Sequence, residues 1–420
     1  MSELLKYKCI ACGGTLKFSS QKQKLICTYC DTTYDVEEFE AAGGVEKQPE
    51  YHEIKDEWDL DKEGLVVYAC KTCGGEVIGS KDLTATKCPF CNNPVVISNK
   101  LKGYLKPDLV IPFRLNKRNA EKTLKEYINS FKFVPDEFVE DYHIKEIKGI
   151  YVPFWTYNAY IEIDVSYIGD KYNKNINTSY YDIKLDGEIK FNKVPVAGSE
   201  RFNDNFMNSI EPYDLSKAVP YSSAYMPGYL AYKYDENALF YQDKAHYRMA
   251  TSIDNLMKNE LNEYDDIIGK KYDYKYKDYS YNYALYPVWF LVTIWKGKKY
   301  IFAMNGQTGK IVGDIPFCKS KGILYGLKIY MILVPILMLF FSGWYNSETA
   351  LFNWFYYSFF GTSLVAILSA ATLVYLKWKN STNKVHKIRT AENYIASGSL
   401  KILNRTVNIV EKNFMDYITK

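Results

Sequence analysis

The sequence predicts a multidomain α+β protein with two N-terminal zinc ribbons, a mixed α+β body that contains antiparallel sheet, and a C-terminal hairpin of two transmembrane helices. Three observations support this fold class: four C-x-x-C pairs in the first quarter of the chain, alternating apolar segments in the middle, and two long apolar runs near the end. We expect the first ribbon at 1–36, an acidic linker at 37–66, the second ribbon at 67–100, the body at 101–320, the hairpin at 321–378 and a helical tail at 379–420.

The cysteine spacing predicts two metal sites. In each copy of the pattern, two C-x-x-C pairs are separated by fourteen residues. Two thiolates of one tight turn can bind one side of a tetrahedral Zn²⁺, and the second pair closes the other side, so no coordination position stays open for catalysis. We therefore expect two structural zinc ions. Their predicted ligands are Cys9, Cys12, Cys27 and Cys30 in the first ribbon, and Cys70, Cys73, Cys88 and Cys91 in the second.

The residues around these cysteines support the same interpretation. The residue after the second cysteine of such a turn must tolerate a left-handed backbone, and Gly13, Asp31, Gly74 and Asn92 are types that do. In the first ribbon, 15–18 and 24–27 are expected to pair as a β-hairpin. A disulfide framework is the alternative, but it needs an oxidising compartment, and the polar segment 1–8 predicts no signal peptide.

Two apolar runs, at 323–341 and 354–376, are each long enough to cross a bilayer, which takes about 20 helical residues. The alternative, two buried helices of a large soluble core, is disfavoured by this length and by the aromatic residues at the run ends. The segment between the runs contains no Lys or Arg. Both outer flanks are basic, so the positive-inside rule predicts an inner or plasma membrane protein whose body and tail are cytoplasmic. The flanking basic residues are Lys310, Lys319, Lys321, Lys377, Lys379, Lys384, Lys387 and Arg389.

The body between the ribbons and the hairpin is predicted to contain sheet and a few helices. The chain contains 40 tyrosines, and this abundance favours β structure in the body. The predicted helices cover 117–131, which Asn116 can cap, and 246–261. The predicted strands cover 151–155 leading into 160–168, then 286–295 and 299–304. Because Pro-x-Trp precedes a long strand in two places, one interpretation is that the body contains two related β units.

Two further segments have a predicted conformation. The segment 305–310, with the sequence NGQTGK, ends like a phosphate-binding loop, but it lacks the first Gly and the final Ser or Thr of that motif. We expect a tight turn led by Asn-Gly instead. In the tail, apolar residues recur at intervals of three and four, which predicts an amphipathic helix. These residues are Ile395, Leu400, Leu403, Val407, Val410, Phe414 and Tyr417.

The sequence contains no recognisable catalytic motif. The four histidines are scattered, without a paired ligand spacing, and no nucleophile elbow, helicase motif or kinase motif is present. A net charge of +4 is too small to imply a nucleic-acid partner by itself. The first ribbon is basic, however, and an acidic linker follows it, which would weaken binding to phosphates. Its basic residues are Lys6, Lys8, Lys17, Lys22 and Lys24.

Several motifs resemble those of bacterial membrane proteins described as TFIIB-type zinc-ribbon-containing, a group that also carries a primosomal-helicase-like label. Beyond the two cysteine quartets and the hairpin, the shared motifs are PDLVIPF at 107–113, YVPFW at 151–155, VPV at 194–196, AYMPGY at 224–229 and FAMNGQTGKIVGDIP at 302–316. The resemblance covers nearly the whole chain. It implies a membrane-stress scaffold with phage-shock-type or SPFH-type protein partners, and it implies no established activity.

Three functions remain open from the sequence. The leading hypothesis is a non-enzymatic, membrane-anchored zinc-ribbon scaffold that recruits cytoplasmic proteins to the lipid bilayer. The alternative is a membrane-tethered nucleic-acid-binding protein that uses Lys17, Lys22 and Lys24, for which salt-sensitive binding would be diagnostic. A third is an enzyme whose site lies in the body, for which a pocket with convergent ionisable groups would be diagnostic.

Overall fold

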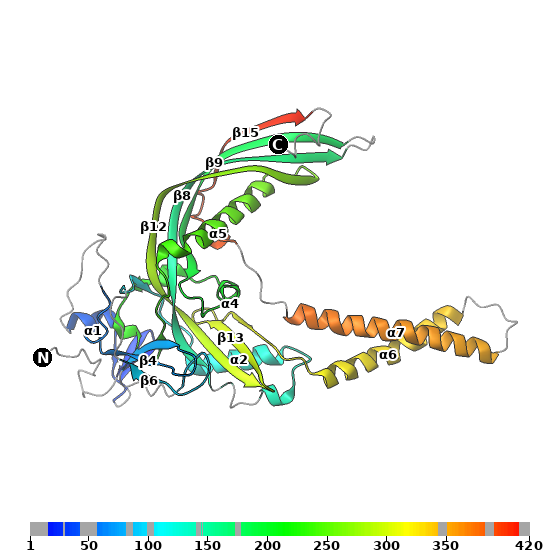
Figure 1. The fold of residues 1–420 in the computed structure, drawn as a ribbon, viewed down its shortest axis with the longest axis horizontal. Coiled ribbons are helices and arrows are strands. Elements are labelled where there is room, and N and C mark those ends of the chain that lie inside the picture. The colour runs from blue at the N-terminus through cyan, green and yellow to red at the C-terminus, as the bar shows by residue number, and fades with distance from the viewer. Residues whose placement is uncertain are drawn as a thin grey trace.

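The computed structural model describes residues 16–27, 30–42, 57–80, 87–98, 105–139, 144, 146–172, 178–342, 351–382 and 390–410. Figure 1 shows three parts: a base that contains the N-terminal elements, a long curved sheet that rises from the base, and a pair of helices that projects from it. The protein is therefore mixed α+β with antiparallel sheet, as the sequence predicts.

Three long strands form the frame of the fold: β8 (Lys148–Tyr172), β9 (Thr178–Ala197) and β12 (Asp266–Trp295). β8 pairs antiparallel with β12 along most of its length, and with β9 from Phe154 to Tyr172. β15 (Lys401–Val410) pairs with the other side of β9. The outer parts of these strands therefore form a four-stranded sheet in the order β15–β9–β8–β12, which we call the blade.

Near the base, short strands extend the sheet on both sides. β7 (Leu109–Val110) and β13 (Lys298–Asn305) pair with β12, β10 (Val219–Pro220) pairs with β7, and β14 (Ile311–Gly313) pairs with β13. On the other side, β11 (Leu230–Ala231) joins β8 to β5. The remaining short elements are α4 (Asp204–Ser209) and the 3₁₀ turns Asp136–Val139, Leu215–Lys217, Ser223–Tyr225 and Glu392–Tyr394.

Several predicted elements of the body are confirmed. α2 (Lys117–Asn129) begins after Asn116, whose side chain accepts a hydrogen bond from the backbone of Asn119. α5 (Ala238–Asn259) covers most of the predicted helix, beginning eight residues earlier and ending two residues earlier than expected. The two Pro-x-Trp segments lie beside each other, with Val152 of β8 opposite Tyr286 of β12.

The helix α5 lies against the concave side of the blade (Figure 1). Tyrosines of the blade pack against this helix. Alternate residues of β12 are tyrosines, and four of them pack against the core. Tyr276 stacks on His246 of α5 with ring centroids 3.9 Å apart. The intervening lysines lie on the other face, where Lys271 pairs with Asp164 at 3.0 Å. This two-residue alternation gives the blade one buried face and one solvent-facing face.

The blade bends at a level where all three long strands are irregular. β8 and β9 shift register between Tyr157 and Ala159, and β12 shifts between Lys277 and Ser280. The side chain of Asn158 connects the three strands at this level, because it donates to Ser280 at 3.1 Å and accepts from the backbone of Lys193 at 2.9 Å. An extra residue in a strand increases local twist and bends it. These bulges therefore curve the sheet over α5.

The two cysteine-rich segments differ in how they join the body. In the first, β1 (Leu16–Ser19), β2 (Lys24–Cys27) and β3 (Thr33–Tyr34) form a separate antiparallel sheet followed by α1 (Val36–Ala42), which confirms the predicted hairpin. In the second, β4 (Leu65–Ala69), β5 (Glu76–Ser80) and β6 (Val96–Ser98) are part of the main sheet. The strands of the second segment are therefore continuous with the sheet of the body.

Part of the predicted acidic linker is also docked on the body. Trp58 is buried and packs edge-on against Tyr221, with ring centroids 5.5 Å apart. Glu63 accepts hydrogen bonds from Trp58 and Tyr221 and pairs with Lys106 at 3.0 Å. The acidic residues at this end of the linker therefore have specific partners in the base, which sequence composition alone does not indicate.

The segment that begins with Asn305 forms the predicted tight turn, between β13 and β14. The Asn305 side chain is fully buried and donates to the carbonyl oxygens of Ile210 and Pro212 at 2.9 and 3.2 Å. Its own oxygen accepts from the backbone N–H groups of Gln307 and Thr308. The asparagine therefore holds two segments of the base together.

We expect Asn305→Ala to destabilise the protein by about 1–3 kcal/mol, because it leaves buried carbonyl oxygens without donors. The control is Thr308→Ala in the same turn, whose hydroxyl makes an exposed hydrogen bond with Lys310 and whose loss should cost under about 1 kcal/mol. The measurement is the denaturant midpoint of each variant in detergent. Equal midpoints would show that the Asn305 hydrogen bonds do not stabilise the base.

Two long apolar helices, α6 (Lys319–Ser342) and α7 (Leu351–Thr382), project from the base side by side (Figure 1). Each contains a 19-residue span that is long and apolar enough to cross a membrane. Only 11% and 17% of the residues in these spans are buried within the protein, whereas a helix of a soluble core would be mostly covered. The helices contact each other through small residues, since Ala366 and Ala370 are buried, and through a 3.0 Å hydrogen bond from Tyr330 to Ser363.

The prediction of a helical tail is wrong for the part that the structure describes. Residues 401–410 form β15, and their backbone pairs with β9. The spacing of Leu400, Leu403, Val407 and Val410 fits a helix, but pairing of the backbone with β9 makes this segment a strand, and nearly all of its side chains are exposed. Phe414 and Tyr417 lie outside the described residues.

A candidate metal centre

Four cysteines converge from two tight turns in the second cysteine-rich segment. In the first turn, the backbone N–H of Cys70 donates to Gly75 at 2.8 Å and that of Gly74 donates to Cys70 at 2.9 Å. In the second turn, Cys88 donates to Asn93 at 2.7 Å and Asn92 donates to Cys88 at 2.9 Å. Gly74 and Asn92 have φ of 66° and 62°, the left-handed backbone that the sequence predicts.

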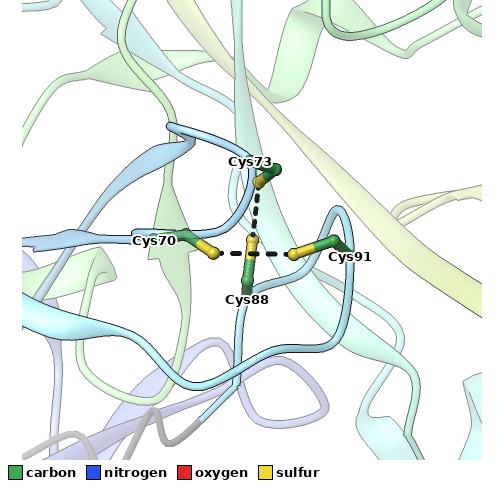
Figure 2. A group of neighbouring side chains, drawn as sticks. All are labelled: Cys70, Cys73, Cys88 and Cys91. Carbon is green, nitrogen blue, oxygen red and sulfur yellow. Dashed lines mark hydrogen bonds between the residues drawn. The ribbon is translucent and has the colours of Figure 1, made fainter.

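The four sulfur atoms form a compact group (Figure 2). The Sγ atoms of Cys70 and Cys91 are 3.5 Å apart, those of Cys73 and Cys88 are 3.6 Å apart, and all four lie within 4.8 Å of one another. These separations are too long for disulfides, in which sulfurs lie about 2.05 Å apart. A tetrahedral ion with metal–sulfur bonds of about 2.3 Å places its ligands roughly 3.8 Å apart. The cluster therefore fits a metal ion.

The surroundings of the cluster raise the pKa of some thiols and lower that of another. Burial raises the pKa of Cys88 to about 12 and also raises the pKa of Cys73. Burial acts on Cys91 in the same direction, but hydrogen bonds from Asn93 and from neighbouring thiols lower the pKa of Cys91 to about 6. A bound cation would remove the cost of burying the other thiolates, because metal replaces the protons.

The cluster is attached firmly to the body. Phe90, between Cys88 and Cys91, packs edge-on against Phe202 and Tyr232 with ring centroids 5.5 and 5.2 Å apart. Arg201 lies over the Phe90 ring and donates to the carbonyl oxygen of Cys73 at 3.4 Å. Cys70 and Cys88 are buried, and Cys73 and Cys91 are half-buried. Four thiolates fill all four positions of a tetrahedral ion and leave none for a substrate, so this ligand set suits a structural ion.

The predicted first site is described only in part. Cys27 is buried at the end of β2, and Cys30 is exposed in the following turn. The backbone N–H of Cys27 donates to Thr32 at 2.9 Å and Asp31 has φ of 56°, two features that the described residues share with the two turns above. Cys9 and Cys12 lie outside the described residues, so a first metal site stays a prediction.

The basic face predicted on the first ribbon is partly neutralised. Lys24 pairs with Asp35 at 2.7 Å, which removes one of its three described lysines from ready contact with phosphate. Lys17 and Lys22 are exposed and lie on the same small sheet and its turn. Lys6 and Lys8 lie outside the described residues.

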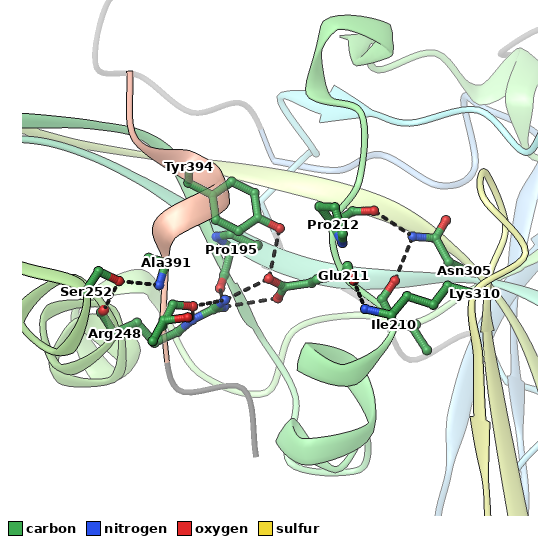
Figure 3. Close-up of polar contacts among 11 residues, drawn as sticks. Pro195, Ile210, Glu211, Pro212, Arg248, Ser252, Asn305, Lys310, Ala391 and Tyr394 are labelled. Atoms are coloured by element: carbon green, nitrogen blue, oxygen red, sulfur yellow. Dashed lines mark hydrogen bonds and ion pairs between the residues drawn. The ribbon is translucent and has the colours of Figure 1, made fainter. Parts of the chain in front are cut away.

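One buried polar cluster was not predicted from the sequence (Figure 3). Arg248 of α5 pairs with Glu211 at 2.7 Å, and both side chains are at least nine-tenths buried. Arg248 also donates to the carbonyl oxygen of Thr390, and Tyr394 donates to Glu211 at 2.9 Å. The cluster holds the chain that follows α7 against α5. The one sequence signal for this cluster is the position of Arg248 within an amphipathic helix.

The chain is similar over most of its length to a bacterial protein. It is 29% identical over 350 residues to a Bacillus subtilis (strain 168) protein described as "Uncharacterized protein YdjG", a match that covers 80% of this chain and 98% of the relative. No family model matches the chain, and no solved structure matches it significantly.

Proposed function

We propose that this protein is a membrane-anchored scaffold, stabilised by zinc, that recruits cytoplasmic proteins to the membrane surface. The observation that carries the proposal is the blade, which ends in a strand available for pairing with another protein. The cysteine cluster and the apolar helices have supporting roles, since one stabilises the base and the other anchors it.

We propose zinc as the ion of the cysteine cluster. Four thiolates in a tetrahedral arrangement are the usual ligand set of structural zinc, and the closed site gives the ion no catalytic position. A second zinc ion, held by Cys9, Cys12, Cys27 and Cys30, is part of the same proposal. The Cys27 hydrogen bond to Thr32 and the left-handed backbone of Asp31 support it, because the second segment has the same two features.

We propose that α6 and α7 cross the inner or plasma membrane, with the body and the blade in the cytoplasm. The low burial of both spans supports this, because so much apolar surface is stable only in lipid or in another protein. The orientation rests on the basic residues at the ends of the helices nearest the base, such as Lys319, Lys321 and Lys377.

The outer edge of β15 is the proposed recruitment site. Among the described residues, β15 has a neighbouring strand on one side only, so its other side presents backbone donors and acceptors. Leu403 and Ile409 are 60% and 70% exposed, and Ile402 and Val407 are also exposed. An extended segment of a partner protein can add to such an edge, with backbone hydrogen bonds for affinity and apolar contacts for specificity.

The opposite edge of the blade, formed by β12, is rich in charged residues. Over the outer part of β12, lysines and aspartates alternate with the tyrosines, including Lys271, Asp273, Lys275 and Lys277. Charged residues, especially lysine, protect edge strands from unwanted pairing. β15 has no acidic residue, and its two basic residues, Lys401 and Arg405, already pair with Glu188 and Glu263. The contrast favours β15 as the edge that accepts a partner.

The test is a pulldown of the detergent-extracted protein with crosslinking, in which crosslinks are mapped by mass spectrometry. We expect partner crosslinks at 401–410, and at least a tenfold loss of the partner in a Leu403→Lys/Ile409→Lys variant. The control is Leu239→Lys, at a comparably exposed apolar residue of α5. Retention of the partner by the double variant would refute recruitment through β15. Salt-sensitive recovery of nucleic acid, lost on changing Lys17 and Lys22, would favour the nucleic-acid alternative.

A further inference from the structure

The first turns of α6 are locked to one loop of the base. The backbone N–H of Cys318 donates to the carbonyl oxygen of Phe133 at 2.7 Å. Phe133 packs edge-on against Tyr325 of α6 with ring centroids 5.5 Å apart. Lys321 donates to the carbonyl oxygen of Val134 and pairs with Asp136 at 2.6 Å. The loop 131–136 therefore lies at the level where the first apolar span begins.

Two lysines from distant parts of the chain meet at Tyr325. The ammonium group of Lys132, in this loop, lies 6.0 Å from the centroid of the Tyr325 ring. The ammonium group of Lys377, the last residue of the second apolar span, lies 4.9 Å from the same centroid and donates to the Tyr325 hydroxyl at 3.0 Å. Three segments thus place two positive charges around one aromatic ring.

The two carboxylates that follow Lys132 most closely in the sequence are already paired. Asp136 pairs with Lys321, and Glu137 lies 3.7 Å from Lys296. In the part of the chain that the structure describes, Lys132 forms no ion pair. Two ammonium groups held together repel each other, and an anion between them would reverse this cost.

We infer that Lys132, Lys377 and Tyr325 form a binding site for the phosphate of an anionic phospholipid. The inference rests on the proposed membrane insertion, which places this ring at the ends of both spans, where headgroups lie. A phosphate oxygen there can accept from both ammonium groups, while the acyl chains lie along the exposed apolar residues of α6, such as Leu324 and Leu327. A zwitterionic headgroup would bring its own positive charge to the two lysines and bind less well.

The experiment measures lipid binding to the full chain purified in detergent. Native mass spectrometry counts the phosphatidylglycerol or phosphatidylcholine molecules retained, and inorganic phosphate is added in a separate arm. The test variant is Lys132→Gln/Lys377→Gln. The matched control is Lys319→Gln/Lys379→Gln, which removes two charges from the same ends of the helices; the ammonium group of Lys379 lies over the ring of Tyr375. Thermal melts confirm that each variant is folded.

We expect one retained phosphatidylglycerol, at least a tenfold loss of its binding in the test variant, and less than a twofold change in the control. Equal losses in both variants would overturn the site, because they would indicate general charge attraction. Equal retention of phosphatidylcholine, or displacement of the lipid by millimolar inorganic phosphate, would overturn it as well. Carbonate extraction of cell membranes tests the anchor separately. If the protein stays in the membrane but the test variant binds as much phosphatidylglycerol as the wild type, only the lipid site is refuted.

Discussion

Replacing Cys88 and Cys91 with serine is expected to release the ion and to disorder the two cysteine turns together with β4, β5 and β6. The expected effect is large, because structural zinc contributes about 10–16 kcal/mol of apparent binding free energy in zinc-finger peptides, and this energy is folding energy. Here the base already packs Phe90 against Phe202 and Tyr232, so part of the structure should persist without metal.

The measurements are zinc per chain and amide hydrogen exchange in the wild type and the variant. We expect faster exchange in 65–80 and 87–98 and slow exchange retained in β8 and β12. Cys318→Ser is the control, since Cys318 is hydrogen-bonded to Ser320 far from the cluster. Zinc content unchanged in the double variant would contradict the assignment of these ligands. The residual zinc in the variant also reports whether the first ribbon holds a second ion.

Arg248→Ala is expected to destabilise the protein by about 3–5 kcal/mol, because it leaves the Glu211 carboxylate buried without its partner. The effect should exceed that of an ordinary ion pair by a wide margin. The same helix provides the comparison: Lys244 pairs with Asp204 at the same 2.7 Å distance, but both side chains are more than 40% exposed. Exposed pairs contribute only about 0–1 kcal/mol, so Lys244→Ala should have little effect.

The measurement is the unfolding free energy of both variants in detergent, with tryptophan fluorescence as the signal. A further variant, Arg248→Met/Glu211→Met, should recover part of the loss, because apolar residues of similar volume often replace a buried pair without cost. If Arg248→Ala and Lys244→Ala lower the unfolding free energy by similar amounts, burial does not determine how much the Arg248 ion pair contributes to stability. A double variant as unstable as the single one would indicate that the hydrogen bonds to Thr390 and Tyr394 dominate instead.

Local signals made much of the fold predictable. The cysteine turns, the helix that Asn116 caps, the Asn305 turn and the two apolar helices all depend on residues close together in the sequence. The cluster of Cys70, Cys73, Cys88 and Cys91 was likewise predictable, since tetrahedral ligation requires two tight turns and the chain shows both. In each case the residues that determine the structure lie within one turn, one helix or one repeated cysteine spacing of each other.

Features that depend on distant contacts were not predictable. β15 has no buried face, so its conformation depends on its pairing with β9, about 200 positions earlier in the chain. The second cysteine-rich segment looked like a separate module, since nothing local indicates that Ile78 pairs with Ala231. Arg248 and Glu211 are 37 residues apart, and no spacing rule relates two charges that meet in a core.

The pairing of β15 with β9 makes the apolar helices an insertion within the fold. Lys401 meets Glu188 across 213 positions of chain, and α6 and α7 lie between them in the sequence. During synthesis, both helices leave the ribosome before the last strand of the blade exists. Assembly of the blade is therefore completed only after the helices have been made. A soluble fragment cut before α6 would lack this strand and the Tyr394 hydrogen bond to Glu211, so it would not reproduce the native body.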